Sequence, residues 1–186
     1  KNLNVRSIDS LLLHDHKKII KKNNQIIFNW IESLKERKLI NRFGISIYSP
    51  EDLIDINLEK KDLIQLPFSI YDQRFRENGL INYLSNNGIS VHIRSIILQG
   101  LILQKSILWP KNISESFKLH HTKFLQEIDK NKLNLLEEIL RAPFFCKGVE
   151  AVVIGITSCF EFEEIVSKWN KFNSNETNEI IKSEDW

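Results

Sequence analysis

The sequence predicts an α/β fold built around parallel strands. Short apolar runs of strand length alternate five times with longer stretches that have helical spacing. The first run, residues 8–15, has continuous apolar residues, as a strand covered on both faces would show. The repeated strand–helix order implies parallel strands joined by right-handed crossovers.

The first half of the chain contains three of the predicted strands, at residues 8–15, 42–48 and 62–70. A helix is predicted over 26–40, where apolar residues recur at helical spacing. A second helix is predicted over 49–58, because Ser49 is a favoured N-cap and Pro50 suits the first helical position. A third, short helix over 79–88 is expected to end at Gly88.

The second half contains the fourth strand and the loop after it within 89–103, a long helical region over 114–140, a fifth strand over 151–156 and a helix over 161–172. His120 and His121 are expected on the surface of the long helical region. Residues 1–172 are thus assigned to one folded part, and 173–186 to a polar C-terminal tail. An open doubly wound sheet and a piece of a barrel both fit this order. The absence of a Gly-rich fingerprint after any strand counts against a dinucleotide-binding open sheet.

The composition is typical of a globular domain and gives no sign of a nucleic-acid-binding or membrane protein. The 186 residues, with 42% hydrophobic and 27% charged content, are ordinary for a soluble globular domain. A net charge of +2 gives no electrostatic case for a nucleic-acid partner. No apolar run is long enough to span a membrane, so no membrane partner is predicted. Cys146 and Cys159 suit a reducing compartment, and a cytoplasmic location is expected.

Function in either architecture should lie at the C-terminal ends of the strands. The polar residues at these ends are His14, Asp15, Ser46, Tyr48, Gln65, Arg94, Ser95, Thr157 and Ser158. A single histidine is more often structural than catalytic, so His14 alone decides little. Arg94 on a buried strand is costly unless it is paired or faces an anion. The spacing of His, Cys and acidic residues does not predict a metal site.

The sequence segments around these strand ends resemble those of the aldo/keto reductases. This is a family of NAD(P)H-dependent carbonyl reductases with a (β/α)8 barrel. Five segments carry the resemblance in the family's order: "IDSLLLHD" (8–15), "FGISIYSPEDL" (43–53), "LIQLPFSIYDQR" (63–74), "HIRSIILQGLI" (92–102) and "VIGITSCFEFEE" (153–164). The resemblance implies a partial (β/α)8 TIM barrel, containing strands 4 to 8 with their helices. The chain is therefore expected to be the C-terminal part of a longer reductase, and its start at Lys1 agrees with this expectation.

The resemblance also implies roles for individual residues. His14 matches the histidine of the family's Asp-Tyr-Lys-His tetrad, and Ser46 and Gln65 match contacts to the nicotinamide carboxamide. Arg94 stands where a tyrosine commonly stacks on the nicotinamide ring, next to Ser95. The segment that wraps the adenosine phosphate is matched by Thr157, Ser158 and Glu164. Thr157 replaces a usual Lys or Arg, so NADPH and NADH both remain open as cofactors.

The implied function is reduction of a small aldehyde or ketone by hydride transfer. The tetrad's Asp, Tyr and Lys belong to strands one to three, and Tyr48, Tyr71 and Tyr83 lie in no matching context. The chain alone is therefore expected to be inactive. Two alternatives stay open: a non-catalytic cofactor-binding or regulatory module of the same fold, and a truncated product. Open barrel edges would then favour self-association or pairing with another part of the barrel.

Overall fold

The computed structural model describes residues 4–14, 16–54 and 62–174. The chain divides into two compact units. The first unit contains the residues up to Pro67, Arg74–Arg94 and Lys147–Val152. The second contains Phe68–Gln73, Ser95–Cys146 and the residues from Val153 onward.

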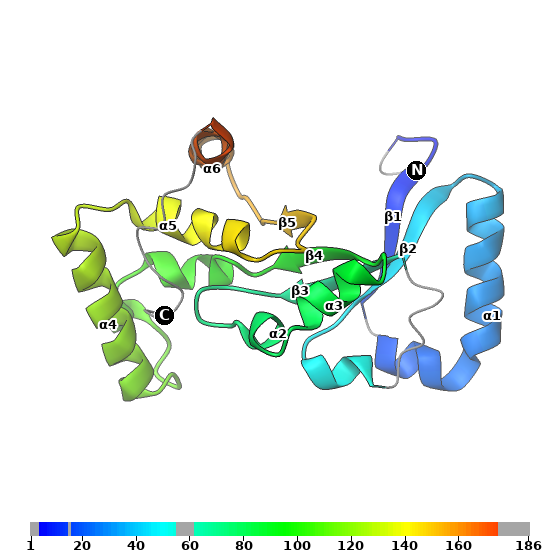
Figure 1. Ribbon diagram of the computed structural model, residues 1–186, viewed down its shortest axis with the longest axis horizontal. Coiled ribbons are helices and arrows are strands. Elements are labelled where there is room, and N and C mark those ends of the chain that lie inside the picture. The colour runs from blue at the N-terminus through cyan, green and yellow to red at the C-terminus, as the bar shows by residue number, and fades with distance from the viewer. Residues whose placement is uncertain (1–3, 15, 55–61, 175–186) are drawn as a thin grey trace. The chain divides into compact units, whose positions relative to one another are not determined.

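A parallel sheet forms the centre of the first unit (Figure 1). Its strands are β1 (Ile8–Leu13), β2 (Ile40–Ser46), β3 (Leu63–Pro67), β4 (Ser90–Arg94) and β5 (Ala151–Val153), whose last residue falls in the second unit. They lie side by side in chain order. This arrangement confirms the predicted partial (β/α)8 barrel of five parallel strands, although β5 ends at Val153 rather than at residue 156.

The sheet is covered on both of its faces. Leu63 and Ile64 are consecutive residues of β3 and therefore point to opposite faces, yet both side chains are fully buried. Gly44 of β2 pairs with Leu63, and a Cβ added to Gly44 would come within 2.2 Å of the Leu63 carbonyl oxygen. The close approach of these two strands therefore requires glycine at position 44.

Helix α1 (His16–Glu36) packs beside β2 through Phe28 and Ile31, which are both buried (Figure 1). The helix begins earlier than the predicted span of 26–40 and ends before Ile40, which is the first residue of β2. Lys38, with a φ of 54°, turns the chain from the helix into the strand.

The other helices in the described part of the first unit are the 3-10 turn η1 (Pro50–Leu53), α2 (Arg74–Glu77) and α3 (Leu80–Asn86). Helix η1 begins after Ser49 as predicted, and residues 55–58 of the expected helix lie outside the described residues. Helix α3 ends just before Gly88, which has a φ of 74°, as the sequence predicted.

The second unit consists of helices: η3 (Leu98–Leu103), η4 (Ser106–Leu108), α4 (Glu115–Lys130), α5 (Leu135–Arg141), η5 (Ala142–Phe145) and α6 (Cys159–Ser174). The predicted long helical region over 114–140 contains two separate helices, α4 and α5. The chain leaves α4 after Lys130, and Lys132 adopts a φ of 55°. The Asn134 side chain then accepts a hydrogen bond from the Glu137 amide and caps a new helix, α5.

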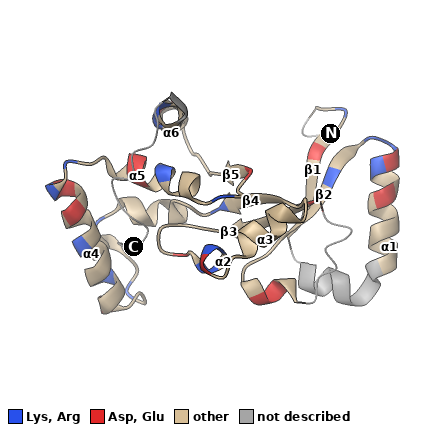
Figure 2. Ribbon diagram, viewed as in Figure 1, with Lys and Arg blue, Asp and Glu red and all other residues tan. Residues whose placement is uncertain are grey.

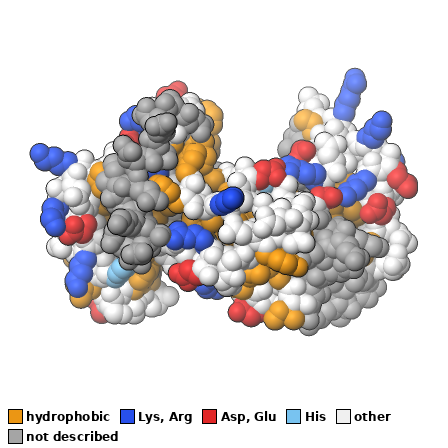
Figure 3. Space-filling model, in the orientation of Figure 1, with side chains coloured by type: hydrophobic (Ala, Val, Ile, Leu, Met, Phe, Trp, Pro, Cys, Tyr) orange, Lys and Arg blue, Asp and Glu red, His pale blue; other side chains and the backbone are white. Residues whose placement is uncertain are grey.

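Charged side chains of both signs are interspersed on the visible face and along α4 (Figures 2 and 3). Within the described part of the chain, no helix is both long enough and apolar enough to cross a membrane. Helix α6 reaches Ser174, so it includes the first residues of the predicted tail, whose residues 175–186 are outside the described ranges.

Candidate functional site

Three predicted site residues lie at the C-terminal ends of strands in the first unit, and a fourth, Gln65, lies in the middle of a strand instead of at its end. His14 follows β1, Ser46 ends β2, Gln65 lies in β3 and Arg94 ends β4. Parallel strands place their C-terminal ends along one edge of a sheet. The strand register pairs Ser46 with Gln65 directly, and the Ser46 hydroxyl donates a hydrogen bond to Gln65 Oε1 at 3.2 Å. These two residues therefore form one polar group at the sheet edge.

His14 contacts a residue that the sequence did not assign to the site. The Tyr48 hydroxyl lies 2.9 Å from His14 Nε2, and the two rings meet edge to face with centroids 5.8 Å apart. Both side chains are exposed. The sequence alone assigns no role to Tyr48, because the residues around it do not match those around the family's catalytic tyrosine. Only the fold brings the end of β1 beside the segment after β2.

Arg94 completes this cluster. Its guanidinium Nη2 donates to the Ile47 carbonyl oxygen at 3.1 Å, and the guanidinium carbon lies 4.5 Å from the centroid of the Tyr48 ring. The charge is thus paired with a backbone dipole and an aromatic face, which offsets the expected cost of placing it on a half-buried strand. Tyr48 is held at its ring by Arg94 and at its hydroxyl by His14.

The loop that carries Tyr48 is fixed by Asp52. This buried carboxylate accepts hydrogen bonds from the Tyr48 amide at 2.8 Å and the Ser49 amide at 3.1 Å. Asp52, in the first turn of the helical segment that follows Ser49, therefore also fixes the backbone of the site loop.

The turn after β4 has an unusual backbone. Ser95, Leu98 and Gln99 have φ values of 68°, 47° and 56°, and Gly100 has a φ of 83°. Left-handed conformations at residues other than glycine cost free energy and cluster at functional sites. Ser95 therefore lies in a sharp turn, and Gln99 and Gly100 face a cavity of the second unit.

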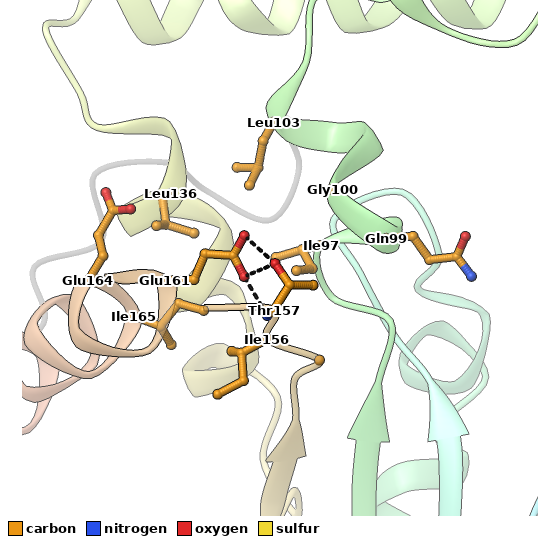
Figure 4. Close-up of a pocket in the computed structure, with 11 residues that line it drawn as sticks. Ile97, Gln99, Gly100, Leu103, Leu136, Ile156, Thr157, Glu161, Glu164 and Ile165 are labelled. Carbon is orange, nitrogen blue, oxygen red and sulfur yellow. Dashed lines mark hydrogen bonds between the residues drawn. The ribbon is translucent and has the colours of Figure 1, made fainter. Parts of the chain in front are cut away.

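This cavity has a volume of about 380 Å³, which is within the range of small-molecule sites (Figure 4). Its walls are largely apolar, and the side chains that form them are Ile97, Leu103, Leu136, Ile156 and Ile165. Its polar side contains Gln99, Thr157, Glu161 and Glu164. The predicted Thr157 and Glu164 therefore share one cavity, whereas Ser158 is not part of its lining.

Glu161, at the start of α6, is the residue of this cavity that sequence reasoning missed. Its carboxylate accepts hydrogen bonds from the Thr157 amide at 2.7 Å and from the Thr157 hydroxyl at 2.9 and 3.0 Å (Figure 4). These hydrogen bonds lower the pKa of Glu161, and the bond from the Thr157 amide has the largest effect. Ser158 instead accepts from the Glu161 amide at 3.2 Å, as an N-cap does.

A buried aromatic cluster lies elsewhere in the second unit. His121 is fully buried, so its predicted surface position is wrong. Its Nε2–H donates to the Gln104 carbonyl oxygen at 2.8 Å, and its Nδ1 accepts from the Tyr71 hydroxyl at 2.7 Å. Trp109 stacks on the imidazole with centroids 4.4 Å apart. Burial lowers the pKa of His121 and raises that of Tyr71.

The described residues contain no group of three or more His, Cys, Asp or Glu side chains placed to hold a metal ion. Cys146 is buried and Cys159 is exposed, and both are free thiols.

A sequence model of the aldo/keto reductase family matches residues 1–183. This chain belongs to the aldo/keto reductase family. Among curated proteins, no sequence matches it. In this member of the aldo/keto reductase family, the strand-end residues His14, Ser46 and Arg94 lie in the first unit, and the Thr157–Glu164 segment lies in the second.

Solved structures of other aldo-keto reductases share its fold. An enzyme from Bacillus halodurans in its apo form is 22% identical, with a TM-score of 0.70 over 98% of this chain and 61% of that one. The glycerol dehydrogenase from Gluconobacter oxydans is 18% identical, with a TM-score of 0.58 over 97% and 64% of the two chains. The present chain spans 54 to 64% of the length of these and similar structures.

Proposed function

We propose that this chain is the cofactor-binding part of an NAD(P)H-dependent reductase that acts on an aldehyde or ketone. The supporting observation is the cluster at the sheet edge of the first unit, where His14, Ser46, Gln65 and Arg94 follow successive strands in the family's order. Bound reduced nicotinamide would supply the hydride for the carbonyl carbon.

Ser46 and Gln65 are suited to hold a nicotinamide carboxamide. The Ser46 hydroxyl already bonds to Gln65 Oε1, which fixes the orientation of the Gln65 side chain and directs its amide nitrogen elsewhere. Because Ser46 is 2% exposed, its hydroxyl is held in place before a ligand arrives. A fixed donor and acceptor pair of this kind recognises an amide without a large ordering cost.

His14 would orient the substrate carbonyl by a hydrogen bond from its imidazole. Its exposed position leaves the ring accessible, and Tyr48 fixes the ring orientation through the 2.9 Å contact. In the family, the proton comes from a tyrosine of the preceding strands. A carbonyl oxygen at His14 would also lie near the Tyr48 hydroxyl, which makes Tyr48 a positioning residue of the proposed site.

The cavity of the second unit fits the adenosine end of the cofactor. Its aliphatic walls can receive the adenine ring, and Gln99, Thr157, Glu161 and Glu164 offer polar groups for the ribose. We assign Thr157 and Glu164 to this end of the cofactor, with Ser158 supporting them as the cap of α6 and Ser95 shaping the turn that leads to Gln99.

The chain covers 54% and 61% of two of the structures it matches. By the resemblance, the family's Asp, Tyr and Lys would belong to earlier barrel strands. We propose that these strands complete the barrel by pairing with the sheet edges at β1 and β5. By itself the chain should bind cofactor and fail to turn over a carbonyl substrate.

The test has two stages. Isothermal titration of this chain with NADH and NADPH measures cofactor binding. The coding sequence upstream of Lys1 is then read, and a protein extended by the preceding barrel units is assayed for cofactor oxidation with a panel of aldehydes and ketones. His14→Ala in the extended protein should lower turnover at least about tenfold and keep cofactor affinity, whereas His120→Ala should change neither.

The alternative of a non-catalytic module is favoured by one observation. Ile47 is fully buried and offers no side-chain amide where the family commonly has asparagine, and Arg94 is already engaged with Ile47 and Tyr48. Cofactor binding without reduction of any carbonyl by the extended protein would support the module and contradict the reductase proposal.

A further inference from the structure

We infer that the cavity of the second unit selects a nucleotide with a free ribose 2′-hydroxyl, NADH over NADPH, and that Glu161 is the residue that imposes this choice. The inference rests on the proposed function, in which this cavity receives the adenosine end of the cofactor.

The first argument concerns hydrogen-bond donors. A 2′-phosphate needs N–H or O–H donors, and the start of a helix commonly supplies them. In this chain the Glu161 carboxylate already takes both the amide and the hydroxyl of Thr157, at 2.7 and 2.9 Å. A phosphate could reach these donors only by displacing a carboxylate of the same charge sign.

The second argument concerns charge. The charged residues among the described lining of the cavity are Glu161 and Glu164, and no Lys or Arg is among them. Lys168 lies one turn further along α6, at 3.8 Å from Glu164 and 3.5 Å from Glu137, so its charge is shared between two carboxylates. A phosphate near charge −2 would therefore face Glu161 without a compensating cation in the lining.

The third argument is that the same carboxylate suits a ribose diol. An ionised carboxylate has about four acceptor positions, and Thr157 offers only two donors, its amide and a hydroxyl hydrogen that lies near both carboxylate oxygens. Acceptor capacity therefore remains for a further donor. The hydrogen bonds from Thr157 also keep the pKa of Glu161 below its usual value, so the group is an anion at neutral pH. It can therefore accept a bond from a ribose hydroxyl.

Figure 4 shows the anionic acceptor beside an apolar wall. Glu161 points toward Thr157, and the aliphatic side chains of Ile97 and Ile156 lie beside them. An apolar wall beside an anionic acceptor matches an uncharged nucleoside with hydroxyl donors. It does not match a nucleoside that carries an additional phosphate.

The experiment compares ligands that differ only at the 2′ position. Isothermal titration measures the affinity of this chain for ADP-ribose and for 2′-phospho-ADP-ribose, which lack nicotinamide and so report on the adenosine end. We expect ADP-ribose to bind at least roughly tenfold more tightly, the effect of one charge-assisted hydrogen bond. NADH and NADPH should show the same order.

Two variants assign the preference to Glu161. Glu161→Gln should weaken ADP-ribose binding and strengthen binding of the 2′-phosphate, so that the ratio of the two affinities falls several-fold. Glu163→Gln, at an exposed position of α6 outside the cavity lining, should leave the ratio unchanged. Circular dichroism checks that both variants keep the helical content of the wild-type chain.

The outcomes separate the inference from the function on which it rests. Equal or tighter binding of 2′-phospho-ADP-ribose by the wild-type chain would overturn the inference and leave the reductase proposal intact. Failure of this chain and of the extended protein to bind any of the four nucleotides would overturn both. The wild-type comparison needs no variant, so it holds even if Glu161→Gln does not fold.

Discussion

The Tyr48 hydroxyl lies 2.9 Å from His14 Nε2, and so connects the segment after β2 to the end of β1. Arg94 holds the other side of Tyr48 from the end of β4, with its guanidinium carbon 4.5 Å from the ring centroid. Three strand ends are thus linked through one tyrosine side chain.

Replacing this tyrosine should affect the histidine more than the fold. Tyr48→Phe removes the hydroxyl and keeps the ring, so the 15N resonance of His14 Nε2 should shift in NMR spectra. Because Tyr48 is 48% exposed, the free energy of unfolding should fall by no more than about 1 kcal/mol. Tyr83→Phe, at an exposed position of α3, is the matched control. An unchanged His14 resonance in Tyr48→Phe would show that the contact is absent in solution.

Gly44 should tolerate no side chain. A Cβ at this position would come within 2.2 Å of the Leu63 carbonyl oxygen and 2.8 Å of the Leu63 Cβ, so β2 and β3 would have to separate. We expect Gly44→Ala to lower the free energy of unfolding by about 1–3 kcal/mol, as measured by urea denaturation. Gly155→Ala is the control, because a Cβ there meets no atom within 4 Å. Equal stability of the two variants would contradict the observed strand spacing.

His121 should make the second unit sensitive to mild acid. Burial, the largest cause, lowers its pKa in the folded state below the ordinary value of 6.5, so the unfolded chain binds a proton first as the pH falls. Stability should therefore decrease as the pH drops below about 6.5, with a slope of at most about 1.4 kcal/mol per pH unit from this group.

The variant pair His121→Gln and His120→Gln isolates this contribution. Urea denaturation at a series of pH values should show a weaker pH dependence in His121→Gln. His120→Gln should change it less, because His120 is exposed and its charge is only the smallest cause of the lowered pKa of His121. The same slope in all three proteins would show that His121 is not buried in its neutral form.

Arg42 should protect the sheet against acid. Its guanidinium contacts Asp9 of β1 and Glu150, each at 2.7 Å. Hydrogen bonds from Ser10 and Arg42 lower the pKa of Asp9 to about 2, and hydrogen bonds from Ser90 and Arg42 lower that of Glu150. Because both carboxyl groups have a lower pKa in the folded state than in the unfolded chain, they stabilise the fold at any pH above their unfolded-state pKa. This stabilisation is lost as the pH falls toward 2.

Arg42→Gln should therefore raise the pKa of both carboxyl groups in an NMR titration and move the midpoint of acid unfolding to a higher pH. Lys130→Gln is the control, because the ion pair between Lys130 and Glu127 is largely exposed and has little effect on stability. Unchanged carboxyl titrations in Arg42→Gln would exclude the ion-pair network as the cause of the lowered values.

The sequence by itself determined the order and number of the strands and several element boundaries. These features depend on local chemistry: continuous apolar residues mark a strand covered on both faces, Ser49 begins a helical turn, and Gly88 follows the end of α3. The parallel pairing of β2 and β3 then places Ser46, the last residue of β2, beside Gln65 in the middle of β3.

Only the tertiary structure decided which side chains from separate segments of the chain come into contact. Apolar spacing continues on both sides of Asn131, so periodicity could not show that α4 and α5 are separate helices. The burial of His121 depends on Tyr71 and Trp109, which approach from distant parts of the chain. Tyr48 escaped prediction because its hydrogen bond joins residues that are far apart in sequence and leaves no local pattern. Glu161 bonds to the nearby Thr157, but only the fold shows that both residues line a cavity with Ile97, Leu103 and Leu136.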